Sequence, residues 1–199
     1  MARRSDFEVL MIQTKNISLI WKDVHGIASC NVANKLDLAM LDWQYELTES
    51  LKIWIDKGLE MTTGELILAR ANLGAVVESW LRFFYCVFYD DYMKQPKVNK
   101  KGHVLEPEKD LRFEDLKTFS TGILWDDENS DDYKWVDSVQ KKRNAIHSFT
   151  YKDIGTPLDF LHDVCYLRKF VDMILNHLPP VEEYIKCYPE GYVLNVYYG

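Results

Sequence analysis

The sequence contains no paired cysteines, no glycine-rich loop and no long uninterrupted apolar run. Its 4 cysteines lie at wide, irregular spacings without a CxxC pair, so neither a zinc ribbon nor a disulfide framework is indicated. We expect reduced, mostly buried thiols. The phosphate-binding P-loop and the HExxH and GxSxG signatures are also missing, so nothing indicates the nucleotide, zinc or serine-hydrolase sites built on them.

A secretory leader and an excess of positive charge are lacking too. The first residues are basic, but the segment after them is amphipathic and carries Asp6, Glu8 and Lys15, so it predicts neither a signal peptide nor a membrane span. We therefore expect a cytoplasmic protein that does not contact a membrane. With 31 acidic and 24 basic residues the formal charge is -7, which argues against coating nucleic acid through a broad positive field. Any contact with RNA must be local.

Apolar and aromatic residues are abundant. The 199 residues are 47% apolar, which is enough for a single domain over residues 1–199 with its own core. The chain has 6 Trp, 12 Tyr and 9 Phe, which favours thick layers between long elements or a surface used for self-association.

Helical periodicity predicts three long helices in the first half of the chain, over residues 6–25, 32–57 and 62–88. The second should bury one stripe, formed by Leu36, Met40, Trp43, Leu47, Leu51 and Trp54. The third opens on Thr62 and Glu65, which have the spacing of a capping box. Small residues such as Gly74 should let another helix approach it closely. Four residues apart on this helix, Glu78 and Arg82 predict a simple surface ion pair.

The second half predicts a polar loop over 95–110 and a short helix over 113–119. The acidic stretch 126–132 lacks the ligand spacing and central glycine of a calcium loop, so we interpret it as a solvated loop that ends at a helix start. That helix should run from about residue 132 to about residue 149. The last helix starts with Thr156 as cap and Pro157 at its first position, and Pro179 and Pro180 end it. A tail over 179–199 contains the only strand-like composition, at 192–198. The expected fold is therefore an all-α, multi-helix up-and-down bundle with a short extended C-terminal tail.

The segment Lys142–Phe149 brings together a permanent cation, an amide and an imidazole. On an α-helix, residues four apart share a face, so Arg143 and His147 should project toward a common point. Arginine offers a planar fork of donors to phosphate, and histidine exchanges a proton near neutral pH, so the pair could cleave RNA without a metal. The alternative is that the Lys-Lys-Arg run is a solvated face and that His147 is a structural residue.

Two stretches resemble the HEPN superfamily of all-α domains. One is Leu73–Leu81, which includes Glu78 as a candidate supporting residue, and the other is Arg143–Phe149 followed by Asp153–Thr156. The similarity covers about residues 65–178. It implies a helical bundle that often dimerises, so that two motifs face each other across a shared cleft. Many members are metal-independent RNases in toxin, anti-phage and RNA-processing systems, and others have lost catalysis.

The resemblance implies specific roles for the residues of the motif. Arg143 and His147 would be catalytic, and Asn144 would orient the phosphate or the ring. The family most often places four to six residues between its Arg and its His, whereas three separate Arg143 from His147. Either Arg143-Asn144 forms the polar pair in a motif shortened by one residue, or Lys142-Arg143 occupies those places. We favour the first because Arg143 and His147 would lie about 40° apart around an α-helix, against about 140° for Lys142.

Two functional hypotheses follow. In the first, the chain is a metal-independent endoribonuclease, a toxin or phage-defence component that acts on RNA, forms a homodimer and has an antitoxin or defence protein as partner. In the second, it is a catalytically inactive dimerisation or interaction module in which the same residues tie helices together. Neither hypothesis requires a cofactor. No metal is expected at the motif, because Lys142 and Arg143 repel cations and the motif holds no second His, Cys or carboxylate.

Overall fold

The computed structural model describes residues 4–147 and 149–179, and within these ranges it contains helices and turns but no β-strand. The prediction of an all-α helical bundle is therefore confirmed, while the strand-like part of the predicted tail lies outside the described residues. The elements are α1 (Arg4–Trp21), α2 (Cys30–Leu38), α3 (Leu41–Lys57), α4 (Thr63–Val87), α5 (Tyr89–Tyr92), α6 (Phe113–Phe119), α7 (Asp131–Arg143) and α8 (Pro157–His177), with 3₁₀ turns η1 (Gly58–Glu60) and η2 (Asn144–His147).

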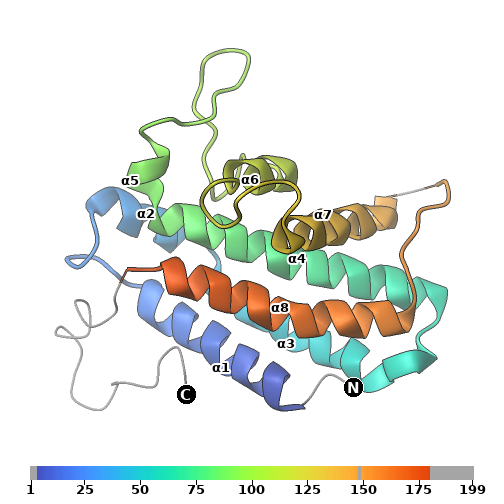
Figure 1. Cartoon of the computed structure of the whole chain (residues 1–199). Helices are drawn as coiled ribbons and strands as arrows, with labels where there is room; N and C mark the ends of the chain where they lie inside the picture. Colours follow the sequence, from blue (N-terminus) through green and yellow to red (C-terminus); the bar gives the residue numbers. More distant parts are fainter. Residues whose placement is uncertain (1–3, 148, 180–199) are drawn as a thin grey trace.

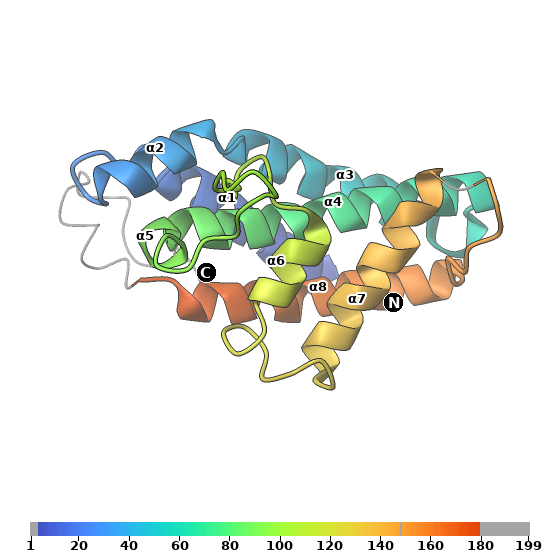
Figure 2. The same ribbon diagram turned by 90° about the horizontal axis from the view of Figure 1, so that it is seen from above.

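Helix α4 is the central element of the bundle (Figure 1). It contacts α2 and α3 on one flank and α8 on the other, and α1 packs between α3 and α8. Helices α6 and α7 lie across the remaining face of α4, as the view from above shows (Figure 2). The end of α7, which carries the predicted motif, is therefore held against the middle of the domain.

The start and the buried face of α4 follow the sequence closely. Thr62 caps the helix through its side chain, which accepts a hydrogen bond from the Glu65 amide, and the Glu65 carboxylate accepts from the Thr62 amide at 2.9 Å. The predicted capping box is thus confirmed. The predicted apolar stripe is buried along the helix, at Leu66, Ala69, Leu73, Val76, Val77, Trp80, Leu81 and Phe84.

The prediction of one helix over residues 32–57 was wrong. The chain leaves the helical conformation at Ala39 and restarts at Leu41, so α2 and α3 are separate helices. The break changes which face of α3 points inward. Met40 and Trp43 from the predicted stripe are more than half exposed, whereas Gln44 and Thr48 are buried. Helix propensity and hydrophobic periodicity did not predict this break, because no glycine or proline lies at it.

In the second half most boundaries agree with the sequence. The 95–110 segment is a loop, α6 covers Phe113–Phe119, and the acidic stretch leads into α7 with Ser130 as its N-cap. Thr156 and Asp159 form a capping box at the start of α8. One boundary differs: the α-helix of α7 ends at Arg143, and not near Phe149 as predicted.

The free cysteines are less buried than expected. Cys86 is buried in α4, but Cys165 is only half-buried and Cys30 is exposed at the start of α2; Cys187 lies outside the described residues. Among the helices of 4–147 and 149–179, none combines the length and the apolar character needed to cross a membrane.

Candidate functional site

The predicted motif begins on the last turn of α7, where that helix crosses α4. Gly74 on α4 makes the crossing close: a Cβ atom at this position would lie only 2.5 Å from Cβ of Arg143 and 2.6 Å from its Cγ. Any residue larger than glycine would clash here, so the aliphatic part of the Arg143 side chain packs directly on the α4 backbone. The prediction that small residues on α4 admit a neighbouring helix is confirmed at Gly74.

Arg143 is held by a carboxylate and an aromatic ring. Its guanidinium Nη2 lies 2.8 Å from Glu78 Oε2, and its Cζ atom lies 5.9 Å from the centre of the Phe113 ring. The side chain still keeps 34% of its surface exposed. The contacts therefore fix the direction of the guanidinium without closing it off from a ligand.

Glu78 is shared between two arginines. Its Oε1 atom accepts from Arg82 at 2.7 Å, while Arg82 also donates to the backbone carbonyls of Pro107 at 2.7 Å and Leu111 at 2.6 Å. The predicted pair with Arg82 exists, but it is not a simple surface pair, because the Glu78 side chain is only 12% exposed. The cluster of Glu78, Arg82 and Arg143, here called the Glu78 cluster, carries one net positive charge and ties α4, α7 and the 105–111 loop together.

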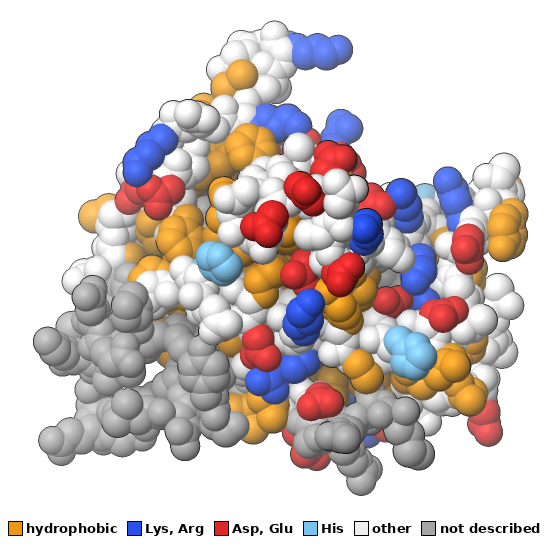
Figure 3. All heavy atoms as spheres, in the orientation of Figure 1, with side chains coloured by type: hydrophobic (Ala, Val, Ile, Leu, Met, Phe, Trp, Pro, Cys, Tyr) orange, Lys and Arg blue, Asp and Glu red, His pale blue; other side chains and the backbone are white. Residues whose placement is uncertain are grey.

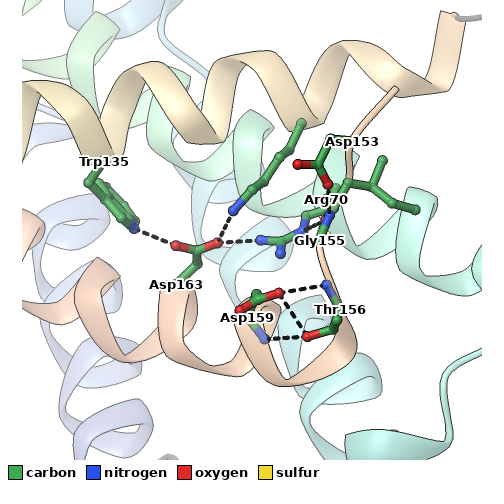
Figure 4. A network of polar contacts seen from close by, with 9 residues as sticks. Arg70, Trp135, Asp153, Gly155, Thr156, Asp159 and Asp163 are labelled. Carbon is green, nitrogen blue, oxygen red and sulfur yellow. Dashed lines mark hydrogen bonds and ion pairs between the residues drawn. The ribbon is translucent and has the colours of Figure 1, made fainter. Parts of the chain in front are cut away.

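Lys142 points away from Arg143 and into a second network, which Figure 4 shows around Asp163. Its Nζ atom donates to Asp163 Oδ2 on α8 at 3.0 Å, and the same carboxylate accepts from Trp135 Nε1 at 3.0 Å and from Nη1 of Arg70. Arg70 is 1% exposed and also donates through Nε to the Ile154 carbonyl at 2.9 Å. This Asp163 network joins α4, α7, α8 and the loop before α8.

The same loop is stabilised where it enters α8. The Thr156 backbone amide donates to the Asp159 carboxylate at 2.8 Å, and this bond, together with the one from the Thr156 hydroxyl, lowers the pKa of Asp159. The positive charges of Lys142 and Arg70 act in the same direction. A carboxylate that stays ionised therefore caps α8 beside the Asp163 network.

His147 and Asn144 belong to the 3₁₀ turn η2 and are both exposed. A 3₁₀ turn advances about 120° and about 2.0 Å per residue, so it does not reproduce the shared face that an α-helix would give residues four apart. The predicted α-helical alignment of Arg143 with His147 was therefore wrong. No hydrogen bond or ion pair joins His147 to the described part of the chain.

The end of the motif and the segment after it expose large apolar and aromatic side chains. Phe149 and Tyr151 are almost completely exposed, at 110% and 91%, and Ile146 is 44% exposed. Figure 3 shows basic and acidic side chains intermixed over the face that it displays. The surface next to His147 thus offers exposed aromatic and aliphatic side chains.

Sequence reasoning singled out neither Arg70 nor Asp163. The sequence did contain a signal for both, since each falls on the apolar face of its helix: Arg70 lies between Leu66 and Leu73, and Asp163 lies between Phe160 and Leu167. A charged residue on such a stripe must find a partner, because an unpaired buried charge is costly. The choice of partner, however, depended on how α4, α7 and α8 pack.

Within the described ranges, no three His, Cys, Asp or Glu side chains come together in a group that could hold a metal ion. Comparison of the chain with protein-family models, with curated proteins and with solved structures finds no match. The resemblance to the HEPN superfamily therefore rests on the two sequence stretches that carry it.

Proposed function

We propose that this chain is a HEPN-like, metal-independent endoribonuclease. The observation that carries the proposal is the contrast at the motif: Arg143 is held in place but one-third exposed, while His147 is exposed and has no partner in the described chain. An exposed imidazole can transfer a proton. The guanidinium of Arg143, which Glu78 holds at the end of α7, can stabilise charge on a phosphate.

In the proposed reaction, His147 takes the proton from a ribose 2′-hydroxyl. The 2′-oxygen then forms a bond to phosphorus, the bond from phosphorus to the 5′-oxygen breaks, and the leaving oxygen acquires a proton. The products are a 2′,3′-cyclic phosphate and a 5′-hydroxyl. Arg143 would neutralise the charge on the non-bridging oxygens, Asn144 would orient the phosphate, and Lys142 would contribute only its positive field, since Asp163 already binds its amine.

A homodimer fits this proposal. One chain offers a single histidine at the motif, whereas the reaction needs both a proton acceptor and a proton donor. A second copy facing the first across the motif would supply the other imidazole and would cover Phe149 and Tyr151. Sedimentation at micromolar concentration should show a dimer, and a strictly monomeric chain would count against this arrangement.

The decisive experiment compares RNA cleavage by the wild-type chain and by His147→Ala in buffer that contains EDTA. Because general acid–base catalysis contributes about 10²–10⁴-fold, the variant should lose at least about 10²-fold in rate. Its unfolding midpoint should not change, since His147 is exposed and makes no hydrogen bond or ion pair with the described residues. Arg143→Lys should recover little of the activity lost in Arg143→Ala, because a point charge cannot replace the bidentate fork.

One structural observation favours a second candidate, an inactive interaction module. Both cations of the motif already form ion pairs inside the chain, Lys142 with Asp163 and Arg143 with Glu78. Such residues could serve only to fix α7 on α4 and α8. A wild-type chain that cleaves no RNA in vitro or in cells, together with an equally inert His147→Ala, would favour this module and reject the ribonuclease.

A further inference from the structure

A cleft of about 220 Å³ opens where α2 breaks into α3, beside α4 and the 105–111 loop. Its rim carries three large apolar side chains, Leu38, Met40 and Trp43, which are all more than half exposed. Phe83 contributes an aromatic ring to the wall. A small opening with apolar walls is the usual form of a ligand site, and this one is suited to a small ligand.

Two polar side chains in the lining are buried and incompletely paired. Gln44 is 3% exposed, and its Nε2 atom has no hydrogen-bond partner in the described chain. The Glu108 side chain is 4% exposed, and its Oε2 atom likewise has none. Buried polar atoms without partners are rare in folded proteins, because each loses its bonds to water without compensation. Here a donor and an acceptor of this kind line the same cleft.

The charge of Glu108 is already balanced. Its other oxygen, Oε1, lies 3.1 Å from Lys35 Nζ, which also binds Glu106 at 2.8 Å. Burial alone would lower the pKa of Lys35, but its hydrogen bonds to these two carboxylates raise it, so the amine remains charged. A ligand therefore needs only a neutral N–H group to satisfy the free oxygen, and an added cation would gain little.

Two other polar groups that line the cleft, on Arg82 and Cys86, are already paired or remain neutral. The guanidinium of Arg82 donates to Glu78 and to two backbone carbonyls. Burial raises the pKa of the Cys86 thiol to about 12, so the thiol stays neutral. The unpaired polar atoms of the cleft are thus an amide donor and a carboxylate acceptor between apolar walls.

We propose that this cleft binds a small, neutral, planar molecule with a cyclic-amide edge. Its N–H would donate to Glu108 Oε2, and its carbonyl oxygen would accept from Gln44 Nε2, with Trp43 and Phe83 against the ring. Both protein atoms are shielded from water in the unliganded chain. Rotation about the terminal carboxyl and amide bonds, which are broad torsions, would bring them to the ligand. This inference does not depend on the ribonuclease proposal.

The test uses two probes that differ at the ring nitrogen: 2-pyridone carries the N–H donor, and N-methyl-2-pyridone carries a methyl group in its place. Each is titrated into the full-length chain while the indole N–H signals are followed by NMR, with Trp43 assigned by substitution. The first probe should shift the Trp43 signal and bind at least about tenfold more tightly than the second, equivalent to about 1.4 kcal/mol. Equal affinities, or no binding of 2-pyridone, would overturn the proposal.

A matched pair of variants locates the site. Glu108→Gln replaces the charged acceptor by a neutral one and should weaken 2-pyridone binding about tenfold, equivalent to about 1.4 kcal/mol. Glu106→Gln perturbs the same Lys35 but does not line the cleft, so affinity should not change. If Glu108→Gln does not fold, Gln44→Met serves in its place and should weaken binding through loss of the amide donor. Wild-type affinity in a folded Glu108→Gln or Gln44→Met chain would reject the site.

Discussion

Lys142 and Arg143, two consecutive residues of α7, belong to two polar clusters. The clusters are similar in composition but differ in how exposed their arginines are. In each, one carboxylate is shared by a residue of α7 and an arginine of α4: Asp163 in one, Glu78 in the other. Arg70 of the Asp163 network is 1% exposed, whereas Arg143 of the Glu78 cluster is 34% exposed. A buried charge cannot leave its partner, but an exposed one can exchange it for a phosphate. The first cluster therefore serves the fold, whereas the proposed function requires Arg143 of the second to exchange its carboxylate for a phosphate.

The largest expected effect comes from breaking the buried cluster. Asp163→Ala leaves Arg70 charged and buried, so we expect a loss of about 3–5 kcal/mol in the free energy of unfolding. Denaturant titration measures it. Asp56→Ala removes a carboxylate of α3, which is 59% exposed and pairs only with Lys52 among the described residues, and should cost less than about 1 kcal/mol. Similar losses in the two variants would contradict the distinction between the clusters.

The crossing of α7 on α4 should be the next most sensitive point. Gly74→Ala would place a methyl group against the stem of Arg143, which must move away, at a cost of about 1–3 kcal/mol. Gly64→Ala, at the start of the same helix, meets no atom within 4 Å and should be neutral or slightly stabilising. Thermal melts of the two chains give the comparison. A Gly74→Ala chain as stable as Gly64→Ala would show that the close approach is not required.

Removing the carboxylate of the open cluster should cost less. Glu78→Ala releases two arginines that keep access to water, so we expect a loss of about 1 kcal/mol, which becomes smaller at high salt. Denaturant titration at low and high salt checks it. A salt-independent loss as large as that of Asp163→Ala would mean that the Glu78 cluster is as closed as the Asp163 network.

The smallest effect concerns the cap of α8 beside the Asp163 network. The pKa of Asp159 is lowered in the folded chain, so the stability that it contributes is present above its unfolded value, about 3.9, and is lost as the pH falls through the folded value. The stability difference between wild type and Asp159→Asn should therefore shrink in acid. Urea midpoints measured across the acid range test it, and a difference that stays constant would contradict it.

Capping signals and long apolar stripes allowed most of the fold to be predicted. Thr62, Ser130 and Thr156 begin helices because their side chains satisfy free amides locally, and this chemistry is readable from a few residues. The sequence did not predict the break at Ala39 or the end of α7 at Arg143. Both depend on how the helices pack, and tertiary packing overrides local propensity.

The sequence predicted which residues form the candidate site, but not how those residues are arranged in space. The sequence identified Lys142, Arg143, Asn144 and His147, yet it could not show that the first two bind carboxylates on different helices, α8 and α4. It treated Glu78 and Arg82 as an isolated pair because the third member, Arg143, lies 65 positions beyond Glu78. Contacts between residues so far apart depend on the tertiary fold, which a single sequence does not display.

Lys142 and Arg143 bind carboxylates on two different helices, and this restricts where the chain can change length. One residue inserted between Trp135 and Lys142 would rotate the end of α7 by about 100° and carry both cations away from their carboxylates. An insertion at the exposed turn around Lys101 would disturb no helix and would add little to the entropy of loop closure. Length variants, natural or engineered, should therefore accumulate at that turn and be absent from α7.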